Sequence, residues 1–99
     1  MSFVFGHFMR YRTRTDIVSQ ILQSAAYGAN KTTIMYKSFL SYGQLKEYLT
    51  IVLESGLLER VEGNKEYYTS EKGKEFLRIY KNLEELDNKN ITPIPQRFR

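Results

Sequence analysis

Residues 31–69 contain the feature that most constrains the fold: two helical patterns in close succession, followed at once by two short strand patterns. The clearest element is a helix expected to begin after Ser41 and to end at Gly56. Ser41 with Gln44 three residues later has the spacing of a capping box, in which each side chain binds the other residue's backbone N–H. Apolar residues then recur at helical spacing and predict a buried stripe: Leu45, Leu49, Val52 and Leu53.

A shorter helix is expected just before this one, over about residues 32–38, with Asn30 or Thr32 as its cap. Two of its apolar side chains would face inward, Ile34 and Met35. The linker Phe39-Leu40 is apolar, so we expect it to pin the turn between the two helices to the core.

Two short strands, residues 57–61 and 66–69, flank a turn with Gly63-Asn64 at its centre, which is a hairpin signal. The order of helix, tight turn, helix and hairpin predicts an α+β fold of the winged helix-turn-helix type, with the hairpin as the wing. A small all-helical domain would need no hairpin here. A winged helix docks its third helix in the major groove, so this order suggests DNA as the ligand.

Two further helices are expected on either side of this region. The first begins near Thr15 or Asp16, whose side chains would serve the free N–H groups of its first turn, and Gly28 ends it. The last begins at Thr69 or Ser70 and ends at Asn88. We therefore divide the chain into an aromatic and basic N-terminal segment, a winged helix-turn-helix domain, a C-terminal helix and an extended tail with both prolines: residues 1–14, 15–69, 70–87 and 88–99.

Composition narrows the class of protein. With 99 residues, of which 41% are hydrophobic, the chain supports one domain with a modest core. It has no cysteine, hence no disulfide or thiolate metal site, and no apolar run long enough to cross a membrane. The single histidine, His7, belongs to no recognisable cluster. We predict no enzymatic activity, no cofactor and no bound metal, and a cytoplasmic protein associated with the nucleoid.

The net charge of +4 is unevenly distributed along the chain. Residues 1–49 have six Lys or Arg against two acidic residues, whereas residues 50–90 have seven against nine. The positive half carries the predicted helix-turn-helix, as a surface that meets phosphates should. The alternative is that these charges are only the solvated surface of a basic protein, which would give the same numbers of charged residues. Glu62 and Glu66 leave the tip of the hairpin net negative.

The outward face of the helix after Ser41 supplies the predicted contacts to DNA bases. A turn of 100° per residue puts Gly43, Lys46, Glu47 and Thr50 outward, with Gln44 and Tyr48 on the flank. Gln44 could bridge an adenine edge, Lys46 could meet guanine or a phosphate, and Glu47 could accept from cytosine. Gly43 would let the helix approach closely. Tyr42 lies nearer the buried side in this projection. The full set is Ser41, Tyr42, Gly43, Gln44, Lys46, Glu47 and Thr50.

Phosphate contacts are expected from the first turn of the preceding helix, where side chains and free backbone N–H groups combine. The candidates there are Lys31, Thr32, Thr33 and Lys37, with Asn64 and Lys65 in the hairpin. Three arginines at alternating positions would share one face of an extended backbone and could meet DNA or water: Arg10, Arg12 and Arg14.

Five sequence blocks within residues 11–77 carry a resemblance to a known family: RTDIVSQIL, KTTIMYK, LSYGQLKEYL, SGLLE and YYTSEKGKEFL. In these the chain resembles the archaeal winged-helix family that includes transcriptional regulators and small dimeric chromatin-associated DNA-binding proteins. The resemblance implies a winged-helix fold, double-stranded DNA as partner, and a homodimer built on the C-terminal helix as an antiparallel coiled coil. The expected dimer contacts are Phe76, Ile79, Tyr80, Leu83 and Leu86.

Two departures from that family matter. The C-terminal helix looks shorter than in the chromatin-type members, because Pro93 and Pro95 block its extension. The aromatic N-terminal segment is not part of the shared pattern. Transcriptional regulation is our preferred role, and chromatin-like, nonspecific DNA binding is the variant. A protein–protein interaction module on the same scaffold is the alternative from another class, since fold does not fix function.

Overall fold

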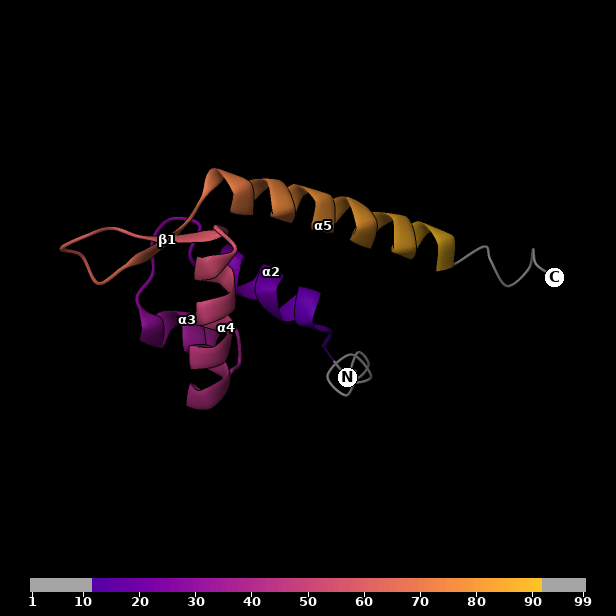
Figure 1. Cartoon of the computed structure of the whole chain (residues 1–99). Helices are drawn as coiled ribbons and strands as arrows, with labels where there is room; N and C mark the ends of the chain where they lie inside the picture. The colour runs from indigo at the N-terminus through magenta and orange to yellow at the C-terminus, as the bar shows by residue number, and fades with distance from the viewer. Residues whose placement is uncertain (1–11, 92–99) are drawn as a thin grey trace.

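The computed structural model describes residues 12–91, with side chains described up to residue 86. Within this range the elements are four helices and one two-stranded antiparallel sheet (Figure 1). In chain order they are α2 (Arg14–Ser24), α3 (Lys31–Lys37), α4 (Tyr42–Glu54), β1 (Leu58–Arg60), β2 (Tyr67–Thr69) and α5 (Glu71–Ile91). The predicted order of helix, turn, helix, hairpin and helix is confirmed. The predictions for Arg10, His7, the aromatic segment and the prolines lie outside the described residues.

Helix α2 begins earlier than expected because its cap is Thr13. The Thr13 hydroxyl accepts a hydrogen bond from the Asp16 N–H at 3.0 Å, and the Asp16 carboxylate accepts one from the Thr13 N–H at 2.9 Å. This reciprocal pair is a capping box. The prediction of Thr15 as a cap was wrong. The helix also ends at Ser24, before Gly28, which lies in the following turn with a φ of +101°.

The predicted cap of α4 is confirmed. The Gln44 N–H donates to the Ser41 hydroxyl at 3.2 Å, and the Gln44 side-chain oxygen accepts from the Ser41 N–H at 3.0 Å. The N-terminus of α3 is capped by Asn30, whose side-chain oxygen accepts from the Thr33 N–H at 2.9 Å. Both helix starts are thus fixed by side chains that the sequence indicated.

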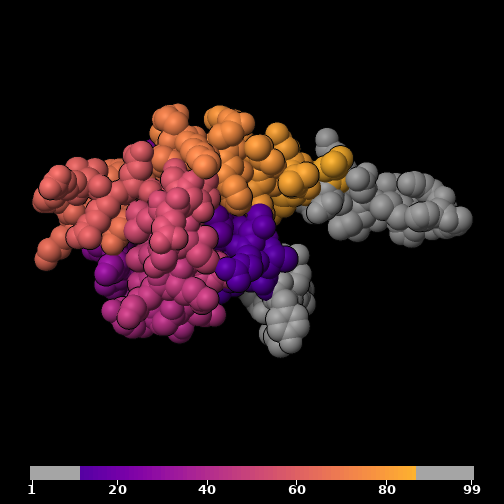
Figure 2. Space-filling model, in the orientation of Figure 1, coloured from indigo at the N-terminus to yellow at the C-terminus, as the bar shows by residue number. Residues whose placement is uncertain are grey.

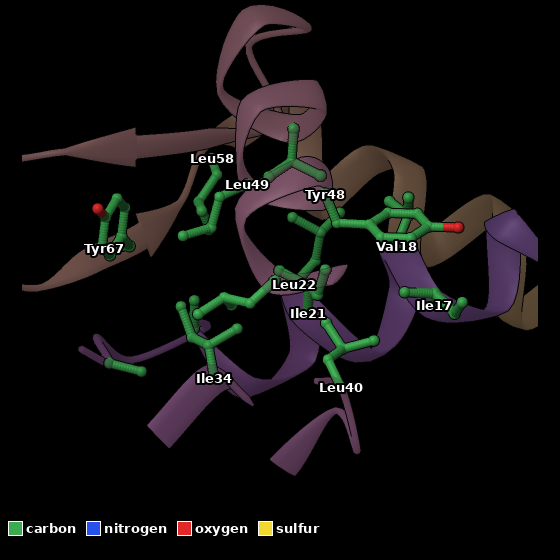
Figure 3. Packing of buried hydrophobic residues seen from close by; sticks show 14 residues of the cluster. Ile17, Val18, Ile21, Leu22, Ile34, Leu40, Tyr48, Leu49, Leu58 and Tyr67 are labelled. Atoms are coloured by element: carbon green, nitrogen blue, oxygen red, sulfur yellow. The ribbon is translucent and has the colours of Figure 1, made fainter. Parts of the chain in front are cut away.

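Side chains from α2, α3, α4 and the hairpin form one core, seen close by in Figure 3. Four expectations about it need correction. Tyr48 is buried and belongs to the core, where we expected it on the flank. Phe39 is 76% exposed and Tyr42 is 62% exposed, so Phe39 does not pin the turn and Tyr42 does not face inward. Leu40 alone anchors the linker, and Leu53 is only partly buried.

The hairpin is tied to the loop before α3. Its register pairs Leu58 with Thr69, Glu59 with Tyr68 and Arg60 with Tyr67. On its other edge, β2 forms an isolated antiparallel bridge with Ala29, in which the two residues exchange hydrogen bonds of 3.0 and 2.8 Å. No sequence pattern predicted this bridge. It places the start of α3 directly beside the hairpin.

Helix α5 crosses α2 and then extends past the rest of the domain (Figure 1). Near its start, the Ser70 hydroxyl accepts from the Gly73 N–H at 3.0 Å and donates to the Gly56 carbonyl at 2.6 Å. Further along, the Tyr80 hydroxyl donates to the Asp16 carboxylate at 2.5 Å. The helix continues to Ile91, beyond the predicted end at Asn88.

Candidate nucleic-acid interface

The N-terminal half of α4 forms an exposed surface on one side of the molecule. Figure 2 shows α4 on the near face, with the hairpin beside it and α5 above it. All seven DNA-contacting positions predicted in this region are exposed: Ser41, Tyr42, Gly43, Gln44, Lys46, Glu47 and Thr50. Gly43 has no atom within 4 Å of the position that a Cβ would occupy, so the backbone there is open to a ligand. All seven positions are therefore accessible to a ligand.

Some of these groups already have a local role. The Gln44 side-chain oxygen is used by the capping box, which leaves its amide N–H groups as the donors for a ligand. The Thr50 hydroxyl donates to the Lys46 carbonyl at 3.1 Å. The Lys46 ammonium lies 5.6 Å from the centre of the Tyr42 ring, a cation–π distance. Lys46 and Tyr42 thus form a pair on the exposed surface.

The predicted phosphate contacts divide into two groups. Lys31, Thr32 and Lys37 on α3 are exposed, and Lys65 is exposed in the hairpin. Thr33 is half-buried, and its N–H is taken by the Asn30 cap. Asn64 uses its side-chain oxygen to accept from the Glu66 N–H at 2.8 Å. The first group is free to meet a ligand, and the second supports local structure.

Arg12 does not point at the ligand side as predicted. Its guanidinium donates to the carbonyl of Ser38 at 2.5 Å, to that of Phe39 at 2.9 Å, and to the Gln20 side chain. It therefore holds the turn between α3 and α4. Arg14 is the first residue of α2, and its guanidinium carbon lies 5.5 Å from the centre of the Tyr48 ring. The expected extended backbone with both arginines on one face was wrong.

The hairpin carries one cation that sequence reasoning missed. Arg60 lies with Lys31 and Lys65 around a hollow of about 360 Å³ between α3 and the hairpin. Its guanidinium carbon is 5.7 Å from the centre of the Tyr67 ring. The pairing of Arg60 with Tyr67 in the hairpin could have been anticipated from the strand register, but the neighbouring Lys31 could not.

The predicted dimer contacts on α5 also divide. Ile79, Leu83 and Leu86 are 52%, 55% and 53% exposed. Phe76 and Tyr80 are partly buried, Phe76 against the core and Tyr80 against Asp16 of α2. The hydrogen bond to Asp16, together with burial, raises the pKa of Tyr80 above its ordinary value of 10.0. Phe76 and Tyr80 thus contact their own domain.

Two kinds of feature are absent from the described residues. No helix there is long and apolar enough to cross a membrane. In the same part of the chain, no group of three or more His, Cys, Asp or Glu residues could hold a metal ion.

Comparison with known proteins identifies the family. The sequence profile of the winged helix-turn-helix family matches residues 11–88. The chain belongs to this winged helix-turn-helix family. Its helix-turn-helix is α3, the turn held by Arg12, and α4, and its wing is the hairpin of β1 and β2.

Solved structures similar to this winged helix include a DNA-binding protein. It is Sso10a-2, described as a DNA-binding protein from Sulfolobus solfataricus, with a TM-score of 0.70 and 20% sequence identity. The similarity covers 89% of this chain and 98% of that one, which supports the fold. No curated protein matches.

Proposed function

We propose that this winged helix binds double-stranded DNA and acts as a transcriptional regulator, with α4 in the major groove and α3 anchored on the phosphate backbone. The observation that carries the proposal is the exposed N-terminal half of α4 next to the exposed Lys31 and Lys37 of α3. Residues 31–46 contain three lysines and no acidic residue. A positive surface beside an exposed helix is the arrangement that DNA binding uses.

The proposal assigns different roles to the two helices. Lys46, Gln44 and Glu47 would contact base edges, and base contacts carry sequence preference. Lys31, Thr32 and Lys37 would contact phosphates, which position the protein without reading sequence. The DNA-binding description of Sso10a-2, a protein of the same fold, is consistent with this assignment.

Binding can be tested by fluorescence anisotropy with a labelled random-sequence duplex at about 50 and 200 mM salt. Released counterions make phosphate-anchored binding weaken steeply with salt, by on the order of a thousandfold for several contacts. Absence of binding at the lower salt concentration would exclude the proposal. Binding followed by selection of a preferred site supports a regulator, whereas equal binding to all sequences supports chromatin-like packing.

Two variants separate the roles of α3 and α4. We expect Lys46→Ala to change the preferred sequence and Lys31→Ala to weaken binding equally for all sequences. Lys81→Ala is the matched control, because it removes one positive charge from an exposed position on α5. If neither Lys46→Ala nor Lys31→Ala differs from this control, the docking model is wrong.

The proposed active form is a homodimer joined through α5. Ile79, Leu83 and Leu86 are each about half exposed and fall at the spacing of a coiled-coil seam. A second copy of the same helix, packed antiparallel, would cover these side chains. Association with chromosomal DNA would locate such a dimer at the nucleoid.

A protein–protein interaction module is the second candidate. Three aromatic side chains around the turn between α3 and α4 are largely exposed: Tyr36 at 67%, Phe39 at 76% and Tyr42 at 62%. Exposed apolar groups gathered in one region can mark a contact surface for a protein. This candidate predicts no salt-dependent binding to DNA, so the anisotropy measurement distinguishes the two.

A further inference from the structure

The two faces of the hairpin differ in charge. Neighbouring residues in a strand point to opposite faces, so the pairs Leu58–Thr69 and Arg60–Tyr67 share one face and Glu59–Tyr68 lies on the other. Leu58, Thr69 and Tyr67 are all buried, so their face is the one that meets the core. Arg60 extends this face beyond the core edge. The hairpin has a net negative charge in the sequence, but this charge is therefore not evenly distributed between its two faces.

Two acidic residues of the hairpin, Glu59 and Glu66, lie on the face opposite Arg60. Glu66 accepts a hydrogen bond of 3.1 Å from the Tyr68 hydroxyl, on the face opposite Arg60. Glu59, the partner of Tyr68 in the register, lines a different hollow with Tyr68 and Lys72. Glu59 and Glu66 thus lie on the face opposite Arg60, and Glu62, in the exposed turn, does not line the hollow beside Arg60.

The bridge between Ala29 and Tyr67 brings α3 to the positive face of the hairpin. Between them lies the hollow of about 360 Å³, which is lined by Asn30, Lys31, Thr32, Arg60, Lys65 and Tyr67. Its lining has three positive side chains and no carboxylate. Among the described residues, the ion pairs are Lys74–Glu71 and Arg78–Glu75, so none involves the cations of the hollow.

The Tyr67 ring gives the hollow a fixed wall. Tyr67 is 3% exposed, and Figure 3 shows it at the edge of the core with its ring packed beside the strands. The Arg60 guanidinium lies 5.7 Å from the centre of this ring, which restricts its orientation. A guanidinium held in this way can offer two parallel N–H donors to one anion, a geometry that suits phosphate oxygens.

We propose that this hollow binds a phosphate group, and that the phosphate belongs to the DNA backbone beside the wing. The proposal rests on the proposed function. Arg60 supplies the directional contact, while Lys31 and Lys65 supply charge from the two walls. The hollow then joins α3 and the wing in one clamp on the DNA backbone. The count of charges in the sequence had predicted only a minor contribution from the wing.

The test compares Arg60→Gln with Arg78→Gln, which removes the same charge from an exposed position on α5. Salt titration of duplex binding is measured for both variants and for the wild type. We expect Arg60→Gln to weaken binding on the order of tenfold at low salt and to reduce the salt slope by about 1. Arg78→Gln should match the wild type. Equal behaviour of the two variants would overturn the proposal, because only net charge would then matter.

A second arm separates the two sources of phosphate. Backbone amide shifts of the wild type and of Arg60→Gln are followed by NMR during titration with inorganic phosphate. One outcome would overturn the DNA assignment. In it, phosphate shifts the amide signals of Lys31, Arg60 and Lys65, Arg60→Gln abolishes these shifts, and the same variant leaves DNA affinity unchanged. The hollow would then be assigned to a free phosphate. Circular dichroism would show whether Arg60→Gln unfolds the protein. In that case Arg60→Lys, which keeps the charge but not the fork of donors, is used in its place. We expect its DNA affinity to lie between that of the wild type and that expected for loss of the Arg60 contact.

These arms also distinguish this inference from the function it rests on. If the wild type fails to bind any duplex, the proposed function fails, and the phosphate titration alone then decides whether the hollow is an anion site. If the wild type binds with steep salt dependence and Arg60→Gln equals Arg78→Gln, the proposed function stands and the clamp is wrong.

Discussion

The guanidinium of Arg12 donates a hydrogen bond of 2.5 Å to the carbonyl oxygen of Ser38, the residue that ends α3. A second bond of 2.9 Å reaches the carbonyl of Phe39, which has a φ of +55°. A non-glycine residue in this left-handed region is disfavoured by about 1 kcal/mol or more. Arg12 thus stabilises the turn that sets the angle between the two helices of the helix-turn-helix.

We expect Arg12→Ala to lower the free energy of unfolding by about 1.5–3 kcal/mol, the range for hydrogen bonds from a charged donor. Urea denaturation measures this change. Arg14→Ala is the control, because Arg14 is exposed and faces the Tyr48 ring at a cation–π distance. A loss for Arg12→Ala no larger than for Arg14→Ala would show that the turn does not depend on Arg12.

Gly43→Ala should separate stability from binding. Alanine is favoured over glycine within a helix by about 0.5–1 kcal/mol, and no atom lies within 4 Å of the added Cβ. We therefore expect a more stable protein, measured by urea denaturation. If α4 enters the groove with its backbone at Gly43 close to the duplex, the same variant binds DNA more weakly in the anisotropy assay. Unchanged affinity would mean that the helix does not approach at this point.

Gly73→Ala should have the opposite effect on stability, although it is also a glycine in a helix. A Cβ at Gly73 would lie 2.3 Å from the Leu57 carbonyl oxygen and 2.6 Å from the Thr69 methyl carbon. The start of α5 would have to move from the hairpin, and we expect a loss of at least about 2 kcal/mol in thermal or urea unfolding. A neutral result would show that α5 is packed more loosely than described.

Tyr80 should make stability depend on pH in the alkaline range. The hydrogen bond to Asp16, with burial, raises its pKa in the folded state above 10.0. Because the folded protein holds the proton more tightly, this contribution is complete below about pH 10 and is lost as the pH rises through the folded-state pKa. We expect Tyr80→Phe to flatten the alkaline decline of the unfolding free energy.

Tyr68 provides the control for this measurement. Its pKa is also raised, mainly by the hydrogen bond to Glu66. Tyr68→Phe should leave unchanged the decline of the unfolding free energy at alkaline pH that Tyr80 causes. An alkaline decline that Tyr80→Phe leaves unchanged would contradict the assigned role of the Asp16 contact.

Leu83→Glu tests the proposed dimer. Leu83 is 55% exposed on α5, so a glutamate there should leave the fold of one subunit intact. In the dimer it would place a charge in an apolar seam, and we expect the variant to sediment as a monomer. Lys81→Glu, at an exposed neighbouring position, is the control. A wild type that sediments as a monomer at high concentration would refute the dimer.

The sequence predicted best those features that local chemistry decides. The Ser41–Gln44 capping box and the Gly63-Asn64 turn each lie within a few residues, and both are present in the structure. Periodicity also found the core of α4, but it misjudged Tyr48, Tyr42 and Phe39. An aromatic residue at the border of a buried stripe can face the core or the solvent. The other helices that pack at that position decide between the two.

The failures at Arg12 and Arg60 have a different cause. Arg12 reaches the end of α3, and Arg60 lines a hollow with Lys31 where the bridge of Ala29 and Tyr67 joins the hairpin to the start of α3. Contacts between segments so far apart in the chain leave no periodic trace in one sequence. Arg12 was therefore judged by charge alone, as a contact to DNA or to water, and Arg60 was not singled out.

The Ala29–Tyr67 bridge has a consequence for how the two surfaces beside the hollow can respond to a ligand. Backbone hydrogen bonds of 2.8 and 3.0 Å hold the start of α3 to β2, so the wing cannot swing freely against the helix-turn-helix. A duplex that touches both must bring its backbone to a spacing that the protein has already fixed. Selection among sequences would then depend partly on how readily each one bends or narrows to that spacing, even at base pairs that no side chain touches.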